Sequence, residues 1–415
     1  MTHDPAAALR LPDYRFFLLA RISFTLAMQI QAVVVGWQIY ELTKDPLALG
    51  LIGLTEAIPA LTMAPFGGHF ADRHRRKPIV LGALIFLFFA SLTLTTLAVT
   101  LGSDPQSVPY LYGVIFFTGL ARGLLSPAFV ALLAQIMPRE LYANAATWNS
   151  VGWQGASVIG PALGGFVYGF FGLAEAYALD AALVGLAACS FFFVTNRPAP
   201  DRPQIAEPML QSLSVGVRYV FKKQEILGAI SLDLFAVLFG GAVALLPVFA
   251  KEVLSVGPEG LGLLRMAPAV GAVVMAVILM LRPPMRHSGW VLLYSVAGFG
   301  ACMILFALST DFYFSLFMLA LSGAFDNVSV VIRSTILQSL TPDHMRGRVA
   351  AVNTMFIGSS NEIGAFESGV AARLLGLVPS VIFGGTMTLL VVVTTALRAP
   401  RLRDLHLGDL EKNQA

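Results

Sequence analysis

Long apolar runs separated by short polar segments fill the chain from end to end. Twelve such runs occur, each near the roughly 20 residues that a helix needs to cross a bilayer core of about 30 Å. They are apolar on all sides and lack the alternation of barrel strands, which predicts spanning helices. We expect these helices at 16–41, 47–71, 79–101, 109–134, 144–171, 174–195, 225–250, 257–281, 289–309, 312–338, 349–376 and 379–397.

Composition supports a membrane protein. The 415 residues are 57% hydrophobic and 12% charged, whereas soluble domains carry about 25% charged residues. The net charge of +3 is spread over the loops and argues against a nucleic-acid partner. The segment from Met1 to Asp13 lacks the features of a secretory signal peptide. The two cysteines, Cys189 and Cys302, lie in apolar runs and indicate neither a disulfide nor a metal site.

Charge asymmetry predicts the orientation. If the N-terminus is cytoplasmic, 20 of the 27 Lys and Arg residues fall in cytoplasmic loops and tails. Only Lys44 and Lys251 then fall in external loops. This positive-inside bias predicts that both termini are cytoplasmic. For the multi-pass protein as a whole, we expect the bacterial inner membrane as its location.

A polar, proline-rich segment divides the chain into two sets of six helices. We expect an N-terminal half at 1–195, a cytoplasmic linker at 196–224, a C-terminal half at 225–400 and a cytoplasmic tail at 401–415. The basic second part of the linker could form a short helix along the inner membrane surface.

The two halves resemble each other at a constant offset of 204 residues. Gly119 corresponds to Gly323, and the offset continues through the following helices and their loop. The other pairs are Pro138 with Pro342, Asn149 with Asn353, Gly160 with Gly364, Gly165 with Gly369, and Gly172-Leu173 with Gly376-Leu377. With six helices in each half, the repeat is parallel.

One short loop carries the most specific motif. Between the second and third runs, the chain reads Gly68-x-x-x-Asp72-Arg73-x-Arg75-Arg76-Lys77. This resembles the G-x-x-x-D-R-x-G-R-R/K loop of the major facilitator superfamily, with Arg75 at the second glycine, so the turn must close without a residue of free φ. The resemblance implies an all-α membrane protein of twelve helices in two pseudo-symmetric six-helix halves.

The same resemblance implies a gate at the inner membrane face. In the family, the acid of this loop latches onto the start of the eleventh helix, here Arg346-Gly347-Arg348-Val349. A carboxylate is stabilised by the free N–H groups at a helix N-terminus. The implied gating residues are Gly68, Asp72, Arg73, Arg76 and Arg348. The second-half counterpart, around 282–287, has basic residues but no acid.

The fifth predicted helix contains Gly155-x-x-x-x-Gly160-Pro161-x-x-Gly164-Gly165. Glycines permit close helix contact, and a proline removes one backbone hydrogen bond. The stretch resembles the glycine-proline motif of antiporters in the superfamily, which favours export. We expect Gly160, Pro161 and Gly164 to bend this helix.

Charged residues within the runs are candidates for proton coupling. Each costs about 2.5–3.5 kcal/mol at the centre of a spanning helix, so each needs a partner or a wet cavity. A carboxylate that approaches Arg122 and then separates from it would bind and release a proton. The candidates are Glu56, Arg122, Asp326, Arg333 and Glu362, each of which could also form a purely structural ion pair. Asp326 and Arg333 are seven residues apart, too far for a direct pair, and are expected to line a wet path.

Polar amides are the substrate-cavity candidates: Gln31, Gln38, Asn149, Gln154, Asn353 and Asn361. The segment from Thr341 to Val349, with 353–362, further resembles the superfamily branch of the enterobactin exporter and the macrolide efflux pumps. The chain lacks a G-x-x-x-x-G-K-[ST] phosphate loop and an H-E-x-x-H motif, so we expect no cofactor, no metal and no direct use of ATP.

Together these features predict a secondary active transporter that works by alternating access, not an enzyme. The leading interpretation is proton-coupled export of a small amphipathic molecule, such as a siderophore or drug, by a monomer in the lipid bilayer. Import or uniport of a metabolite or lipid is the alternative within transport. A non-transporting sensor, a lipid enzyme and a channel fit the sequence less well.

Overall fold

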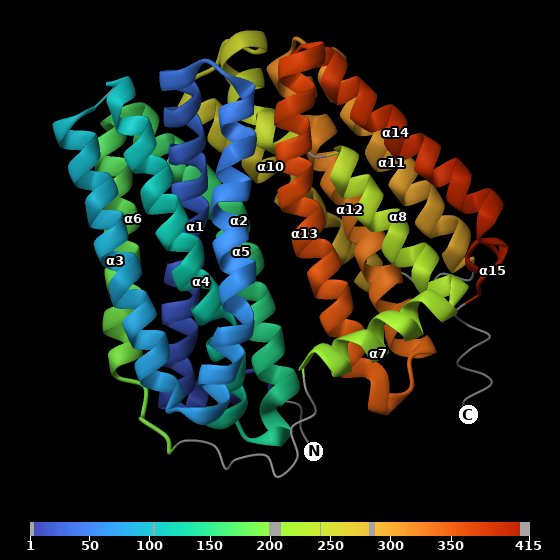
Figure 1. Cartoon of the computed structure of the whole chain (residues 1–415), viewed down its shortest axis with the longest axis horizontal. Coiled ribbons are helices and arrows are strands. Elements are labelled where there is room, and N and C mark those ends of the chain that lie inside the picture. Colours follow the sequence, from blue (N-terminus) through green and yellow to red (C-terminus); the bar gives the residue numbers. More distant parts are fainter. Residues whose placement is uncertain (1–3, 103, 199–208, 241, 282–286, 407–415) are drawn as a thin grey trace. The chain divides into compact units, whose positions relative to one another are not determined.

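The computed structural model describes residues 4–102, 104–198, 209–240, 242–281 and 287–406, and its regular elements in these ranges are all helices (Figure 1). Within these ranges, ten helical spans are long and apolar enough to cross a membrane. Two more long helices, α5 (Tyr142–Phe171) and α13 (Asp343–Leu375), occupy the two remaining predicted positions. The chain is an all-α membrane protein, and the twelve predicted spans each correspond to a helical segment.

The helices begin and end close to the predicted limits. Those of the first half are α1 (Pro12–Thr43), α2 (Pro46–Arg73), α3 (Arg76–Thr100), α4 (Val108–Ile136), α5 and α6 (Leu173–Phe192). Those of the second half are α7 (Met209–Lys222), α8 (Gln224–Gly240), α9 (Leu246–Val248), α10 (Pro258–Met280), α11 (Ser288–Leu308), α12 (Phe312–Leu340), α13, α14 (Leu377–Arg398) and α15 (Pro400–Arg403).

The seventh predicted span is not one regular helix. Helix α8 ends at Gly240, and a 3-10 turn (Ala242–Leu245), the short α9 and a π-helical turn (Phe249–Val253) follow. Pro247 has no backbone N–H to donate, so it fits only the first turn of a new helix. Apolar periodicity predicted the length of this span but could not show the change of helix type.

The chain forms two compact units. Unit 1 comprises Met1–Ala48, Ile52–Gln204 and Ser255–Met266, and unit 2 comprises Leu49–Leu51, Ile205–Leu254 and Ala267–Ala415. In unit 1, α1 packs on α5 and α6, and α3 packs on α4 and α6. In unit 2, α8 packs on α13 and α14, and α11 packs on α12 and α14. The helix pairs that pack together in unit 2 therefore occupy the same places in the repeat as those in unit 1.

Equivalent glycines mark the repeat in both units. Gly172 and Gly376, 204 residues apart, follow α5 and α13 with φ of 117° and 90°. This backbone region is strained for residues with a Cβ, which explains why both positions hold glycine. Gly160 packs on α1 beside Gln29, and Gly364 packs on the backbone of α8. The structure therefore confirms the register inferred from the sequence.

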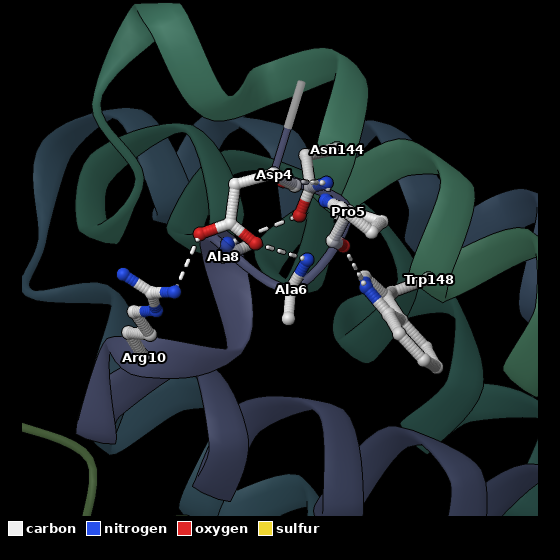
Figure 2. A network of polar contacts seen from close by, with 7 residues as sticks. All are labelled: Asp4, Pro5, Ala6, Ala8, Arg10, Asn144 and Trp148. Atoms are coloured by element: carbon white, nitrogen blue, oxygen red, sulfur yellow. Dashed lines mark hydrogen bonds and ion pairs between the residues drawn. The ribbon is translucent and has the colours of Figure 1, made fainter. Parts of the chain in front are cut away.

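The start of the chain is bound to unit 1 by a polar network (Figure 2). The side-chain amide of Asn144 on α5 accepts from the Ala8 N–H at 3.0 Å and donates to the Pro5 carbonyl at 2.8 Å. Trp148, one turn later, donates its Nε1–H to the same carbonyl at 2.9 Å. Asp4 pairs with Arg10 at 2.8 Å. The segment ahead of α1 is thus held against the first turns of α5.

Helix α7 lies in the linker region and contacts α8 and α13, crossing their ends within unit 2 (Figure 1). The predicted short helix is therefore present, and it is amphipathic, with Val220 in the apolar core. Tyr219 donates its hydroxyl to the Leu340 carbonyl at the end of α12, at 2.8 Å. The pKa of Tyr219 is raised, mainly by burial and to a smaller extent by the negative charge of Glu225. Its hydroxyl therefore remains neutral and can donate this hydrogen bond.

Candidate functional site

Unit 1 contains an ion pair between two membrane-spanning helices. The carboxylate of Glu56 on α2 contacts the guanidinium of Arg122 on α4. The Glu56 side chain is 23% exposed and that of Arg122 is 41% exposed, so the pair is only partly covered by other parts of the protein. Of the acids proposed as partners of Arg122, the structure brings Glu56 to it.

A glycine one turn before Arg122 lets the two helices approach. A Cβ on Gly119 would overlap the backbone carbonyl oxygen of Glu56. Gly123 packs in the same way on Ala60, so α2 and α4 are in backbone contact on both sides of the ion pair. Small residues permit such contact in membranes, and here they set the distance across which Arg122 reaches Glu56.

Unit 2 contains a more deeply buried ion pair. Asp233 on α8 contacts Arg333 on α12, and their side chains are 9% and 6% exposed. The expectation that Asp326 and Arg333 do not pair directly agrees with this arrangement, because Arg333 pairs with Asp233. Asp233 is an acid within an apolar run, and that charge was its only signal in the sequence.

Asp326 lines a small cavity in unit 2 together with Asp233. The remaining lining residues come from α8, α11 and α12: Ala236, Val237, Ser295, Val296, Phe299, Phe325 and Ser329. Arg333 does not line this cavity, and the wet path expected along Asp326 and Arg333 stays a prediction. Glu362 is partly buried on α13 and is absent from this lining.

The predicted cavity amides occupy different environments. Gln38 is buried and accepts a hydrogen bond of 2.6 Å from the Tyr177 hydroxyl, so it holds α1 and α6 together within unit 1. Gln31 is also buried, Gln154 is partly buried and Asn361 is exposed. The side-chain oxygens of Asn149 and Asn353 are buried and have no hydrogen-bond partner among the described residues. These two occupy equivalent positions of the repeat.

The gating loop is a tight turn of two residues. Helix α2 ends at Arg73, and α3 begins at Arg76. His74 has φ −121° and Arg75 has φ −61°, so the turn closes with extended backbone. A turn without positive φ is what the sequence requires, because Arg75 stands where the family motif has its second glycine. Arg76 donates to the Ala131 carbonyl at 2.6 Å and thereby ties the loop to α4. Gly68 and Asp72 belong to α2, but beyond this helix assignment they lie outside the described residues.

The expected target of the gate begins earlier than predicted. The apolar run predicts a helix start at 349, yet α13 begins at Asp343, after the extended residue Pro342. Arg346 and Arg348 are therefore inside the helix, and the free N–H groups belong to its first turn, at 343–346. The predicted boundary was wrong because this turn is polar and apolar periodicity cannot detect it. Arg348 contacts the sulfur of Met345 at 3.9 Å.

The glycine-proline motif lies in the middle of α5. Gly164 packs against the backbone of Ile30, and Gly160 packs against Gln29, both on α1. Pro161 is inside the helix and is buried. The motif thus forms the close contact between α5 and α1, and the bend remains a prediction.

Arg265 is a further charge inside one of the predicted apolar runs. Arg265 on α10 is partly buried, and its Nε makes no hydrogen bond to a described residue. No ion pair with a described acid compensates its charge. An unpaired cation within a spanning helix suits an anionic ligand group, and the only signal in the sequence was a charge inside an apolar run.

Comparison with known proteins identifies the family of this chain. The model of the family described as "Transmembrane secretion effector" matches residues 3–414. The chain belongs to this family and is a transporter of the major facilitator superfamily. Its family and relatives are transporters rather than enzymes, and it is a multi-pass membrane protein.

Its relatives include exporters. The chain is 26% identical to the enterobactin exporter EntS of Escherichia coli O1:K1 / APEC over 398 residues, covering 94% of this chain and 93% of the relative. It is equally similar to EntS of Shigella boydii serotype 18, over 395 residues.

Solved transporters share the fold at low sequence identity. A D-xylose-proton symporter has a TM-score of 0.72 at 14% identity, covering 96% of this chain and all of that one. A POT family transporter in complex with 5-aminolevulinic acid has a TM-score of 0.73 at 11% identity, covering 94% and 96%. At such identities, the likeness concerns the fold alone.

Proposed function

We propose that this protein exports a small amphipathic molecule of the siderophore or drug class in exchange for protons, by alternating access. The observation that carries the coupling part of the proposal is the pair of Glu56 with Arg122, partly covered and between two spanning helices. The similarity to enterobactin exporters supports outward transport and a siderophore-like substrate.

The pair provides a physical route for coupling. Next to a guanidinium, a carboxylate favours its charged form, and in an apolar surrounding without that partner it favours its protonated form. If α2 and α4 separate during the transport cycle, Glu56 gains a proton, and it loses the proton when they close again. Asp326, Arg333 and Glu362 are the remaining coupling candidates.

Substrate recognition involves uncompensated polar groups. Asn149 and Asn353 have buried side-chain oxygens without partners among the described residues, and these oxygens can accept hydrogen bonds from a substrate. Arg265 supplies a positive charge for an anionic group, such as an ionised phenol or a carboxylate. Each of these groups, taken by itself, suits a substrate that carries anionic or hydroxyl groups.

The orientation follows from the distribution of basic residues. The α2–α3 turn carries Arg73, Arg75, Arg76 and Lys77, and this basic cluster supports a cytoplasmic position for the turn and for both termini. Asp72 then closes the inner side by binding the first turn of α13, assisted by Arg73, Arg76 and Arg348. In this account the protein is a monomer of the bacterial inner membrane and performs no covalent chemistry.

Transport into proteoliposomes tests the function. Purified protein would be given a pH gradient and a panel containing enterobactin, other siderophores and hydrophobic drugs. Accumulation of a compound against its gradient, abolished when the pH gradient is collapsed, supports proton exchange. Accumulation in the same direction as the protons would instead favour import, and movement only down the compound's own gradient would favour uniport.

A further inference from the structure

A small cavity in the core of unit 2 has the chemistry of a cation site. It lies between α8, α11 and α12, and its polar lining consists of Asp233, Asp326, Ser295 and Ser329. Apolar groups, including Phe299 and Phe325, form the rest of the wall. Oxygen is thus the only polar element among the side chains that line the cavity.

The charges around this cavity do not balance. Arg333 compensates Asp233, and both side chains are more than nine-tenths buried. Asp326 has no ion-pair partner among the described residues. Helix α11 has no charged residue, and the acids of α13, Glu362 and Glu367, do not line the cavity. With both aspartates ionised, the site carries one excess negative charge, which is costly in an apolar surrounding.

The serine hydroxyls strengthen the assignment. Ser329 is 3% exposed, lines the cavity and makes no hydrogen bond to a described residue. Ser295 is 4% exposed and donates its proton to the Val291 carbonyl at 2.7 Å, so its lone pairs remain available to a ligand. Carboxylate and hydroxyl oxygens are the ligands that hard cations prefer.

The charge and composition select the class of ligand. One excess negative charge matches a single positive charge, whereas a divalent ion would leave the site positive. The described residues hold no group of three or more His, Cys, Asp or Glu side chains placed to bind a metal, which argues against transition metals and against acid-rich divalent sites. We propose that this cavity binds one Na⁺ ion through Asp326, Ser329, Ser295 and Asp233. The site is separate from the Glu56–Arg122 pair and does not depend on the proposed direction of transport.

Binding to the purified protein tests the site without any transport substrate. Equilibrium binding of ²²Na⁺ should saturate at about one ion per chain, and Na⁺ should raise the thermal unfolding temperature relative to choline at equal ionic strength. Asp326→Asn and Ser329→Ala should each weaken Na⁺ binding at least about tenfold, because the loss of even an outer-shell partner of a metal site has an effect of that size.

Two matched variants control for structural damage. Ser322→Ala removes a buried serine of the same helix that donates to the Leu319 carbonyl and does not line the cavity. Asp180→Asn neutralises an acid that is 1% exposed in unit 1. Both should bind Na⁺ as the unmodified protein does.

Three results would overturn the proposal. They are equal stabilisation by Na⁺ and choline, unchanged Na⁺ binding by Ser329→Ala and Asp326→Asn, and proton uptake at Asp326 without any Na⁺ binding. Ser329→Ala removes one hydroxyl and no charge, so it keeps the test valid if Asp326→Asn does not fold.

Discussion

Arg122 and Asp326 occupy the same position in the two halves of the chain, yet they carry opposite charges. Arg122 comes three residues after Gly119, and Asp326 comes three residues after Gly323. Both glycines pack against the backbone of a neighbouring helix, Gly119 against α2 and Gly323 against α10. The packing of the repeat is therefore retained while its charge has diverged. Arg122 forms an ion pair with Glu56, whereas Asp326 lines a cavity beside the separate pair of Asp233 and Arg333.

This divergence gives the two ion pairs different expected roles. The pair in unit 1 is partly exposed, whereas the pair in unit 2 is almost fully buried. Removing one partner of a buried pair leaves an uncompensated charge and costs about 3–5 kcal/mol. Substitutions of Asp233 or Arg333 should thus affect folding, and those of Glu56 or Arg122 should affect coupling.

Neutralising either member of the unit 1 pair should uncouple transport from protons. In Glu56→Gln and Arg122→Ala, accumulation driven by a pH gradient should fall to the level seen without a gradient, because no carboxylate alternates between the two states. Proteoliposome uptake with and without the gradient provides the measurement. Arg197→Ala, which removes an exposed ion pair with Asp13, is the control and should transport normally. A full response to the gradient in Arg122→Ala would move the coupling role to another residue.

The close approach of α2 and α4 should depend on Gly119. In Gly119→Ala, the new Cβ meets the Glu56 carbonyl, so the helices must separate, at an expected cost of about 1–3 kcal/mol. Gly113 on the same helix has no neighbouring atom within 4 Å of the position that a Cβ would occupy, so Gly113→Ala should not destabilise the protein. Denaturation in mixed detergent micelles compares the two variants. Equal stability would contradict the close packing at Gly119.

Loss of Asn144 should release the start of the chain from α5. Asn144→Ala removes the hydrogen bonds to Ala8 and Pro5, each worth about 1 kcal/mol. Hydrogen exchange at the Ala8 amide should accelerate. Thr147→Ala on the same helix is the control, because the hydroxyl of Thr147 bonds to the Ala143 carbonyl of its own helix and to no other described residue. Unchanged exchange in Asn144→Ala would mean that the remaining contacts, the Trp148 hydrogen bond and the burial of Ala8, hold the segment without Asn144.

Arg265 should discriminate between anionic and neutral substrates. In Arg265→Gln, the KM for anionic compounds should rise about tenfold or more, since a hydrogen bond to a charged group is worth about 1.5–3 kcal/mol. The KM for neutral compounds should change little. Arg265→Lys keeps the charge and should retain most of the affinity. A uniform rise for both substrate classes would indicate a structural role.

The gate proposed at Asp72 predicts a loss of transport without a loss of folding. Asp72→Asn keeps the size of the side chain but removes the charge that the α13 N-terminus favours. Transport should decrease while size-exclusion behaviour stays normal. Asp104→Asn, at an exposed turn between α3 and α4, is the control. Normal transport by Asp72→Asn would remove the latch from the proposed cycle.

The sequence predicted the helices well because each spanning helix needs a long apolar run. It also predicted equivalent glycines, such as Gly172 and Gly376, because the turns require a conformation that few other residues adopt. It could not select Glu56 as the partner of Arg122, since the two are 66 positions apart and their contact depends on helix rotation. The same limit concealed the pairing of Asp233 with Arg333. The polar first turn of α13 was missed because helix prediction relied on apolar periodicity.

Proton movement driven by substrate tests the central claim most directly. Proteoliposomes containing the protein and a trapped pH indicator would receive an outward or inward substrate gradient, with no pH gradient imposed. Protons should move opposite to the substrate, and Glu56→Gln should abolish this movement while substrate still equilibrates. Substrate transport without proton movement in the unmodified protein, or with protons moving in the same direction, would contradict proton-coupled export.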